Sequence, residues 1–296
     1  MFDAGRVFRL TARVLILLAV LLGVIEGLTE FLPISSTGHL IIAGHWLAFE
    51  EALGGKARSD AFLIFIQSGA ILAVVFYFRE RLWQRVREAA GGGGARRAGS
   101  VERARRFLAG ICVATVPAVV VGLLANRFLD ALPSEKFVAW VLIAGGAALW
   151  AVDQWRPKPK FAEAEDFGWG VILVVGVAQT LAMLFPGLSR SGATIMAALL
   201  LGAGNKAAAE FSFFLSIPTM CLACSYKLAK AVWRGDVAMD DGMMWAVFGV
   251  GFAVSFVSAA LVVKAFLAFL RKHGFKLFAY YRVVLGAVVL GAGRFF

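Results

Sequence analysis

Cysteine and histidine are both scarce in this chain, which has three of each among its 296 residues. The cysteines lie in apolar segments, and the C-x-x-C pair at 221–224 lacks the strand–loop–helix context that a redox motif needs. We therefore predict that Cys112, Cys221 and Cys224 are small apolar core residues. The sequence also has no zinc-ligand spacing, which excludes a zinc finger.

Acidic residues are in short supply as well. The chain has 19 Asp and Glu against 30 Lys and Arg, which gives a formal net charge of +11. It has no heptad repeat and no basic helix with interleaved aromatic side chains, so we predict no nucleic-acid partner. In a membrane protein, an excess of Lys and Arg marks the cytoplasmic loops, and we interpret the charge as a topology signal.

Long apolar runs, by contrast, fill most of the sequence. Hydrophobic residues make up 60% of the chain, and its mean hydropathy is +0.80. A soluble domain of this length could not bury so much apolar surface. Because no stretch remains for a soluble domain of useful size, we predict a single integral membrane domain over residues 1–296, surrounded by membrane lipid.

Two polar motifs interrupt the apolar runs. The first, E-G-L-T-E-F-L-P-I-S-S-T-G-H, covers residues 26–39 and contains two carboxylates, several hydroxyls and an imidazole. The second, P-G-L-S-R-S-G-A-T, covers residues 186–194. Ionised groups at membrane depth cost about 2.5–3.5 kcal/mol each on insertion scales, so they are kept mainly for function. The two motifs are therefore the candidate functional segments.

Each motif joins a long apolar run to a short one. The runs are about 11–28 with 40–49, and 168–185 with 195–204. About ten residues are too few to cross a hydrocarbon core that is about 30 Å thick. Pro33 and Pro186 end the longer helices, and Ser35 is a suitable N-cap for the first short helix. Both pairs are predicted to be re-entrant helical hairpins.

The hairpins also share a register. Glu26 and Gln179 each lie seven residues before a hairpin proline, and Ser36 and Ser189 each lie three after one. Three predicted spans separate the hairpins, so they enter from opposite faces. We predict an all-α polytopic membrane protein with six transmembrane helices and two re-entrant helical hairpins in an inverted-topology repeat. Repeat one covers about 11–152 and repeat two about 168–296, with a cytoplasmic basic loop at about 79–106. The six predicted spans are 61–78, 107–125, 137–152, 211–231, 242–263 and 277–296.

If the hairpin tips meet, they gather the parts of a phosphoryl-transfer site. Glu26 and Glu30 share a helix face, and a cation between them would relieve their repulsion; Mg²⁺ typically joins one or two carboxylates to substrate phosphates. Arg190 offers a planar fork for phosphate oxygens. Ser36 is the candidate nucleophile, and His39, three residues later, is the candidate acid or base. The candidate substrate-binding residues are Ser35, Thr37, Ser189, Ser191, Thr194 and Gln67.

Structural roles compete with several of these functional ones. The two glutamates could form an internal ion pair with Arg190, and His39 could be a core histidine bonded to a carbonyl. Ser35 and Ser191 are as well suited to helix capping as to reaction. Gln67 could equally be a hydrogen-bonding link between helices.

Together, the two motifs resemble those of the bacterial undecaprenyl-diphosphate phosphatases of the bacitracin-resistance type. The resemblance extends to A-A-A-E-F-S-F at residues 207–213 and to the span pattern. It implies an inner-membrane enzyme that removes the terminal phosphate of undecaprenyl diphosphate, recycles the lipid carrier for peptidoglycan synthesis and confers bacitracin resistance. It also implies dependence on a divalent cation, Mg²⁺ or Ca²⁺, and a site that opens to the periplasmic side. The family's functional positions match Glu26, Glu30, Ser36, His39 and Arg190.

A transporter or flippase of polyprenyl phosphate or another anion is the alternative. Inverted repeats with broken helices are the layout of secondary transporters. A phosphatase releases inorganic phosphate in detergent, whereas a transporter requires sealed vesicles. The sequence leaves a homodimer open.

Overall fold

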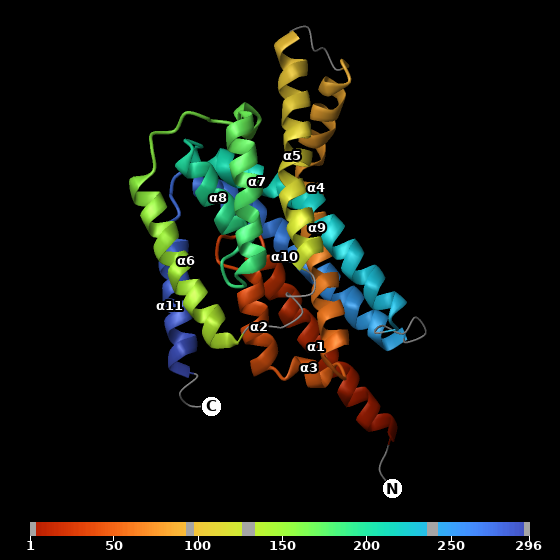
Figure 1. The fold of residues 1–296 in the computed structure, drawn as a ribbon. Coiled ribbons are helices and arrows are strands. Elements are labelled where there is room, and N and C mark those ends of the chain that lie inside the picture. Colours follow the sequence, from red (N-terminus) through yellow and green to blue (C-terminus); the bar gives the residue numbers. More distant parts are fainter. Residues whose placement is uncertain (1–3, 93–97, 126–133, 236–241, 293–296) are drawn as a thin grey trace.

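The structure, a computed structural model, describes residues 4–92, 98–125, 134–235 and 242–292. Regular structure in these ranges is helical, apart from one isolated bridge between Phe161 and Ala203. Figure 1 shows the elements in chain order. They are α1 (Ala4–Thr29), α2 (Ser36–Trp46), α3 (Phe49–Ala52), α4 (Lys56–Ala89), α5 (Ala98–Ala125), α6 (Glu135–Trp155), η1 (Ala164–Asp166), α7 (Trp169–Leu184), α8 (Arg190–Leu200), α9 (Asn205–Trp233), α10 (Gly242–Leu270) and α11 (Lys276–Ala292).

Six helices of the described chain are long and apolar enough to cross a membrane: α1, α4, α5, α6, α9 and α10. Five of these contain spans predicted from the sequence. The sixth predicted span, 277–296, corresponds to α11, whose described part has 17 residues. Instead α1 completes the six, because its apolar part, Ala12–Thr29, is already 18 residues long. The chain is thus an all-helical, multi-pass membrane protein.

The basic segment 79–106, predicted to be a loop, is largely helical. α4 continues to Ala89 and α5 begins at Ala98, so the two helices project together beyond the rest of the molecule at the top of Figure 1. The reason is local: Arg, Glu, Gln and Leu dominate residues 79–88, and all are good helix formers. An ion pair between Arg85 and Glu88, 2.7 Å apart, adds support within α4.

Small residues allow the first arm of each hairpin to pack closely on a helix from the other half of the chain. A Cβ on Gly27 would lie 2.5 Å from the carbonyl oxygen of Ser255 in α10. A Cβ on Gly176 would lie 2.7 Å from the carbonyl oxygen of Ala114 in α5. Such small-residue contacts are the usual basis of close helix packing in membranes. These contacts fix α1 against α10 and α7 against α5. They therefore also fix the positions of the residues at the ends of α1 and α7.

A buried cluster of ion pairs joins η1 to α4 and α9. Arg81 donates to Glu165 at 2.7 Å and lies 2.8 Å from Glu210, while Arg85 donates to Glu165 at 3.0 Å. Burial by itself raises the pKa of Glu165, but the hydrogen bonds and charge of these arginines outweigh it and hold that pKa below its usual range. The cluster holds η1, which lies in the segment between α6 and α7, against α4 and α9.

The cysteines were predicted to be core residues, which is correct for Cys224 alone. Cys112 and Cys221 are exposed on the surface of their helices, and all three thiols are free. In a membrane protein the surface can be as apolar as the core, so an apolar sequence context does not distinguish the two.

Candidate active site

The two polar motifs meet at the carboxylate of Glu30, which is buried just after the end of α1. The Ser36 hydroxyl donates to one carboxylate oxygen, and Arg190 Nη2 donates to the other at 3.3 Å. Ser36 is the first residue of α2, and Arg190 is the first residue of α8. The tips of the two hairpins are therefore in contact, as the sequence predicted.

Both short helices begin in the same way. Ser35 and Ser189 have φ values of 72° and 73°, and their hydroxyls accept hydrogen bonds from Gly38 and Gly192 at 3.2 and 3.1 Å. A left-handed backbone at a non-glycine residue persists only where the surroundings enforce it. Each serine is thus the N-cap of its helix. The first residues of both helices contact the Glu30 carboxylate, and the free N–H groups at a helix N-terminus favour anions.

The N-caps correct the register that was inferred from the prolines. Counting from Pro33 and Pro186 pairs Ser36 with Ser189, whereas the structure pairs Ser35 with Ser189, because the second tip contains one more residue. Ser36 therefore corresponds to Arg190. The same position supplies a hydroxyl in one half of the chain and a guanidinium in the other, and both bind Glu30.

Glu26 lies one helical turn before Glu30 and is fully buried. Neither of its carboxylate oxygens has a hydrogen-bond partner among the described residues. A buried carboxylate without a donor is costly unless it is neutral or binds a cation. Glu26 and Glu30 are therefore the two residues that could hold a divalent cation at this site.

The hydroxyls of the second motif hold the tips and α9 together. Ser191 donates to the Leu32 carbonyl at 2.8 Å, which links the two hairpins directly. The Thr194 hydroxyl lies 2.7 Å from that of Ser212 in α9. Arg190 Nη1 donates to the carbonyl of the same residue, Ser212, at 3.1 Å. Ser191 is thus a link between hairpins, not a helix cap.

His39 hydrogen-bonds to two groups, and Ser36 is neither of them. Its Nδ1 lies 2.7 Å from the Ser35 carbonyl oxygen, and its Nε2 lies 2.7 Å from the Tyr281 hydroxyl in α11. The bond to a carbonyl is the one that a structural histidine was expected to make. Because Ser36 donates to Glu30, the nearest proton acceptor for the Ser36 hydroxyl is a carboxylate rather than the imidazole.

Comparison with known proteins gives the family. The model of the bacitracin resistance protein BacA matches residues 19–288. The chain belongs to the BacA family. A protein named undecaprenyl-diphosphatase from Rhodopseudomonas palustris (strain BisA53) is 46% identical over 283 residues, which cover 94% of this chain and 98% of the relative. Proteins of the same name from R. palustris (strain BisB18) and Bradyrhizobium diazoefficiens are 48% and 45% identical, over 94% and 93% of this chain and 98% of each relative.

Two residues of this BacA-family chain that were predicted to bind substrate lie apart from the Glu30 cluster. Thr37 is exposed and directly follows Ser36 in the first turn of α2. Gln67, in α4, accepts a hydrogen bond from Cys224 of α9 at 3.4 Å, which is the interhelical role considered above. Neither side chain hydrogen-bonds to Glu30, Ser36 or Arg190 in the described structure.

The sequence reasoning missed Arg282, which is fully buried in α11. Its guanidinium donates to the carbonyls of Pro33 at 3.2 Å, Leu188 at 2.8 Å and Gly187 at 3.1 Å, and so touches the backbone of both hairpin tips. The signal that could have found it was an arginine inside a predicted span, at a depth where charges are rarely kept without a role.

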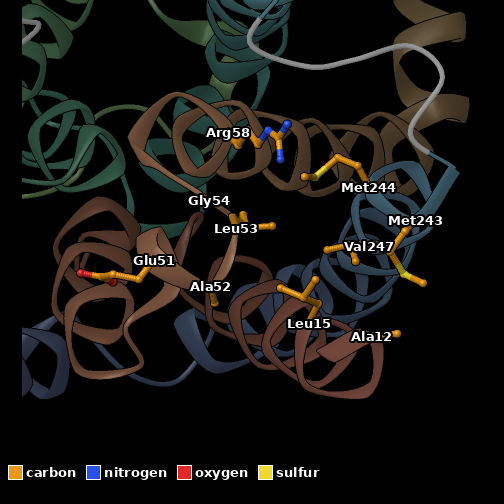
Figure 2. Close-up of a pocket in the computed structure, with 10 residues that line it drawn as sticks. All are labelled: Ala12, Leu15, Glu51, Ala52, Leu53, Gly54, Arg58, Met243, Met244 and Val247. Atoms are coloured by element: carbon orange, nitrogen blue, oxygen red, sulfur yellow. The ribbon is translucent and has the colours of Figure 1, made fainter. Parts of the chain in front are cut away.

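A separate cavity lies between α1, α3, α4 and α10 (Figure 2). Its volume is about 310 Å³, and its polar side chains are Glu51 and Arg58. None of the predicted site residues lines it. The cavity is therefore distinct from the place where the two motifs meet.

Proposed function

We propose that this chain is an undecaprenyl-diphosphatase, which hydrolyses the terminal phosphate of undecaprenyl diphosphate to give undecaprenyl phosphate and inorganic phosphate. The reaction would recycle the lipid carrier for cell-wall synthesis and confer resistance to bacitracin. Membership of the BacA family and the name of the close relatives support the reaction. The observation on which the site rests is the Glu30 carboxylate, held between Ser36 of one motif and Arg190 of the other.

In this proposal the diphosphate lies at the paired N-termini of α2 and α8. Backbone N–H groups and the guanidinium of Arg190 bind its oxygens, because both are suited to phosphate. Displacement of Glu30 from Arg190 by the substrate would leave the carboxylate free to act on Ser36. Ser189, Ser191 and Thr194 shape the second tip, and Ser35 and Thr37 remain proposed contacts of the substrate, whereas Gln67 links α4 to α9.

Ser36 is the proposed nucleophile. Its oxygen forms a bond to the terminal phosphorus while the bridging phosphorus–oxygen bond breaks and undecaprenyl phosphate leaves. Glu30 accepts the hydroxyl proton, and water then cleaves the phosphoserine to release inorganic phosphate. His39 exchanges protons with the phosphate groups, in an acid/base role that no longer includes Ser36. A phosphoenzyme trapped in the native protein and absent from Ser36→Ala would support this order; direct attack by water would leave none.

A divalent cation, Mg²⁺ or Ca²⁺, fits the carboxylate pair. The described residues contain no cluster of three or more metal-binding side chains, so the protein alone does not supply a full coordination sphere. Mg²⁺ is usually held by one or two carboxylates together with substrate phosphates, and Glu26 has two buried oxygens without partners. Glu26 and Glu30 would hold the ion, and it would neutralise phosphate charge.

We also propose the membrane arrangement. α1 and α2 form one re-entrant hairpin and α7 and α8 the other, in an inverted repeat of about 11–152 and 168–296. In Figure 1, α2 extends from the central region into the lower half of the molecule and α8 into the upper half, which supports entry from opposite faces. The Arg-rich ends of α4 and α5 would lie in the cytoplasm of a bacterium, and the site would open to the periplasmic side of the inner membrane.

The decisive experiment is phosphate release from undecaprenyl diphosphate by the purified protein in detergent, with and without a chelator. We expect release that the chelator abolishes and that added Mg²⁺ or Ca²⁺ restores. Detergent has no compartments, so a transporter would release nothing under these conditions. No release by folded protein, together with uptake of polyprenyl phosphate into sealed vesicles, would overturn the proposal in favour of transport.

A further inference from the structure

Two consecutive residues of α11, Tyr281 and Arg282, contact parts of the proposed site that lie far away in the sequence. Tyr281 touches His39, 242 residues earlier, and Arg282 touches both hairpin tips. We propose that this pair positions the site: Tyr281 fixes the orientation and tautomer of His39, and Arg282 sets the two tips at the distance that brings Glu30 to Arg190. The inference rests on the proposed function and extends it to a helix outside both motifs.

The argument for Tyr281 starts from the other ring nitrogen of His39. A carbonyl oxygen can only accept, so the bond to the Ser35 carbonyl requires a proton on Nδ1. In the neutral ring, Nε2 then carries the lone pair, and the Tyr281 hydroxyl donates to it at 2.7 Å. The two rings are also stacked, with an angle of 4° between their planes. Together these contacts fix one tautomer and one ring orientation, with the basic nitrogen on the α11 side.

The argument for Arg282 starts from the backbone at the tips. Where a helix breaks inside a membrane, its carbonyl oxygens lose their helical partners and must find other donors. Arg282 supplies donors to Pro33 in the first tip and to Gly187 and Leu188 in the second. Because the guanidinium is a rigid planar fork, these bonds fix the tips relative to each other.

The surroundings of Arg282 provide carbonyl acceptors for its guanidinium and space for it beside Gly145. No carboxylate of the described chain forms an ion pair with it, so backbone dipoles alone compensate a charge with no solvent exposure. A Cβ at Gly145 of α6 would collide with its Nη2 atom, so glycine at that position leaves the space that the guanidinium fills. A buried charge that is retained without an ion-pair partner is expected to have a role.

The first test separates Tyr281 from its neighbour Tyr280, which is 56% exposed and serves as the matched control. With [¹⁵N]histidine, solid-state NMR of the protein in lipid has only three residues to resolve, since the chain has three histidines. We expect a neutral His39 with its proton on Nδ1 and a hydrogen-bonded Nε2 in the native protein and in Tyr280→Phe. In Tyr281→Phe the signal of that Nε2 hydrogen bond should disappear.

The same variants are then assayed for phosphate release. Tyr281→Phe should lower kcat about tenfold with an unchanged KM, the size expected for loss of one hydrogen bond, and Tyr280→Phe should change neither constant. An Nε2-protonated ring in the native protein, or equal kinetics for the two variants, would overturn the role of Tyr281. The NMR result does not depend on turnover, so failure of the proposed function, seen as no release by the native protein, is distinguishable.

The test of Arg282 avoids removing the charge. Gly145→Ala displaces the guanidinium, whereas Gly286→Ala crowds the same pair of helices, α6 and α11, away from it; a Cβ there would lie 2.6 Å from the Ala139 carbonyl oxygen. We expect Gly145→Ala to lower kcat/KM at least tenfold per folded molecule and Gly286→Ala to lower only thermal stability. Arg282→Lys, which retains the charge without the fork, should behave like Gly145→Ala. Full turnover in Gly145→Ala and Arg282→Lys would overturn the role.

Discussion

At the first hairpin tip Glu26 lies in α1 and Glu30 follows the end of that helix, whereas at the corresponding positions of the second tip α7 carries Gln179 and Met183. The backbones that follow are nevertheless alike, since a serine with a positive φ caps an 11-residue helix in each half. The tips therefore share a fold and differ in charge.

In the proposed inverted repeat, that difference is what allows two copies to build one site. Two helix N-termini provide equivalent clusters of N–H donors, and this requires the backbone to be the same in both halves. In the proposed mechanism the carboxylate and the guanidinium must come from different tips, because two acidic tips would repel each other and two basic tips would leave no base for Ser36. Glu30, which contacts the first helical residue of both short helices, is the point at which the two kinds of chemistry are joined.

The largest expected effect comes from removing the acid of the first tip. Glu30→Gln keeps the size of the side chain but abolishes its ability to take the proton of Ser36, so kcat should fall by about 10²–10⁴-fold. Phosphate release in detergent measures it. The control is Met183→Gln, which places the same amide at the matching position of the second tip and should retain most of the activity. Similar losses in both variants would contradict the division of roles between the tips.

The next effect distinguishes neighbouring hydroxyls within one tip. Ser36→Ala should lower kcat by about 10²-fold or more, because it removes the proposed nucleophile and one ligand of Glu30. Thr37→Ala removes an exposed hydroxyl one residue later and should change kcat far less. A rapid-quench measurement of phosphoenzyme, alongside steady-state rates, checks both expectations; equal rates for the two variants would refute the assignment of Ser36.

The structural equivalence of the two tips can be tested by removing the N-cap side chains of α2 and α8. Ser35→Ala and Ser189→Ala each remove one side-chain acceptor at a helix N-terminus, so each should lower the free energy of unfolding by about 0.5–2 kcal/mol. Thermal unfolding in the same detergent gives the comparison. If one variant were neutral and the other strongly destabilised, the two tips would not be structurally equivalent.

Acidification tests the ion-pair cluster that Glu165 forms with Arg81 and Arg85. The pKa of Glu165 is held below its ordinary value of 4.5 in the folded protein, so its contribution to stability is complete above that value and is lost as the pH falls through the lowered pKa. We expect unfolding temperature to decrease below about pH 4.5 by a smaller amount in Glu165→Gln than in the native protein. An identical decrease in both would show that Glu165 is not the titrating group.

The smallest effect is expected at Gln67, whose amide binds a thiol between α4 and α9. Gln67→Leu should leave kcat and KM within about twofold of the native values, because the lost bond is a weak interhelical one. A large increase in KM would instead restore its predicted role as a contact of the substrate.

Much of the architecture could be predicted from the sequence because its causes are local. Apolar runs define the membrane helices, α1 and α7 end shortly before Pro33 and Pro186, and Ser35 was the expected cap of α2, so the meeting of Glu30 with Arg190 was accessible. The extent of α4 and α5 was underestimated, since charge was taken as the sign of a loop where helix-forming residues continue the helix.

Tertiary structure alone decided the partners within the site. Nothing in the spacing of the first motif says that Ser36 turns to Glu30 while His39 turns to Tyr281, or that the two tips differ by one residue. Nor does it indicate that Arg282 bonds to both tips. Helical periodicity determines which face a side chain occupies, but its hydrogen-bond partners depend on which distant helix packs against that face, and only the folded chain sets that.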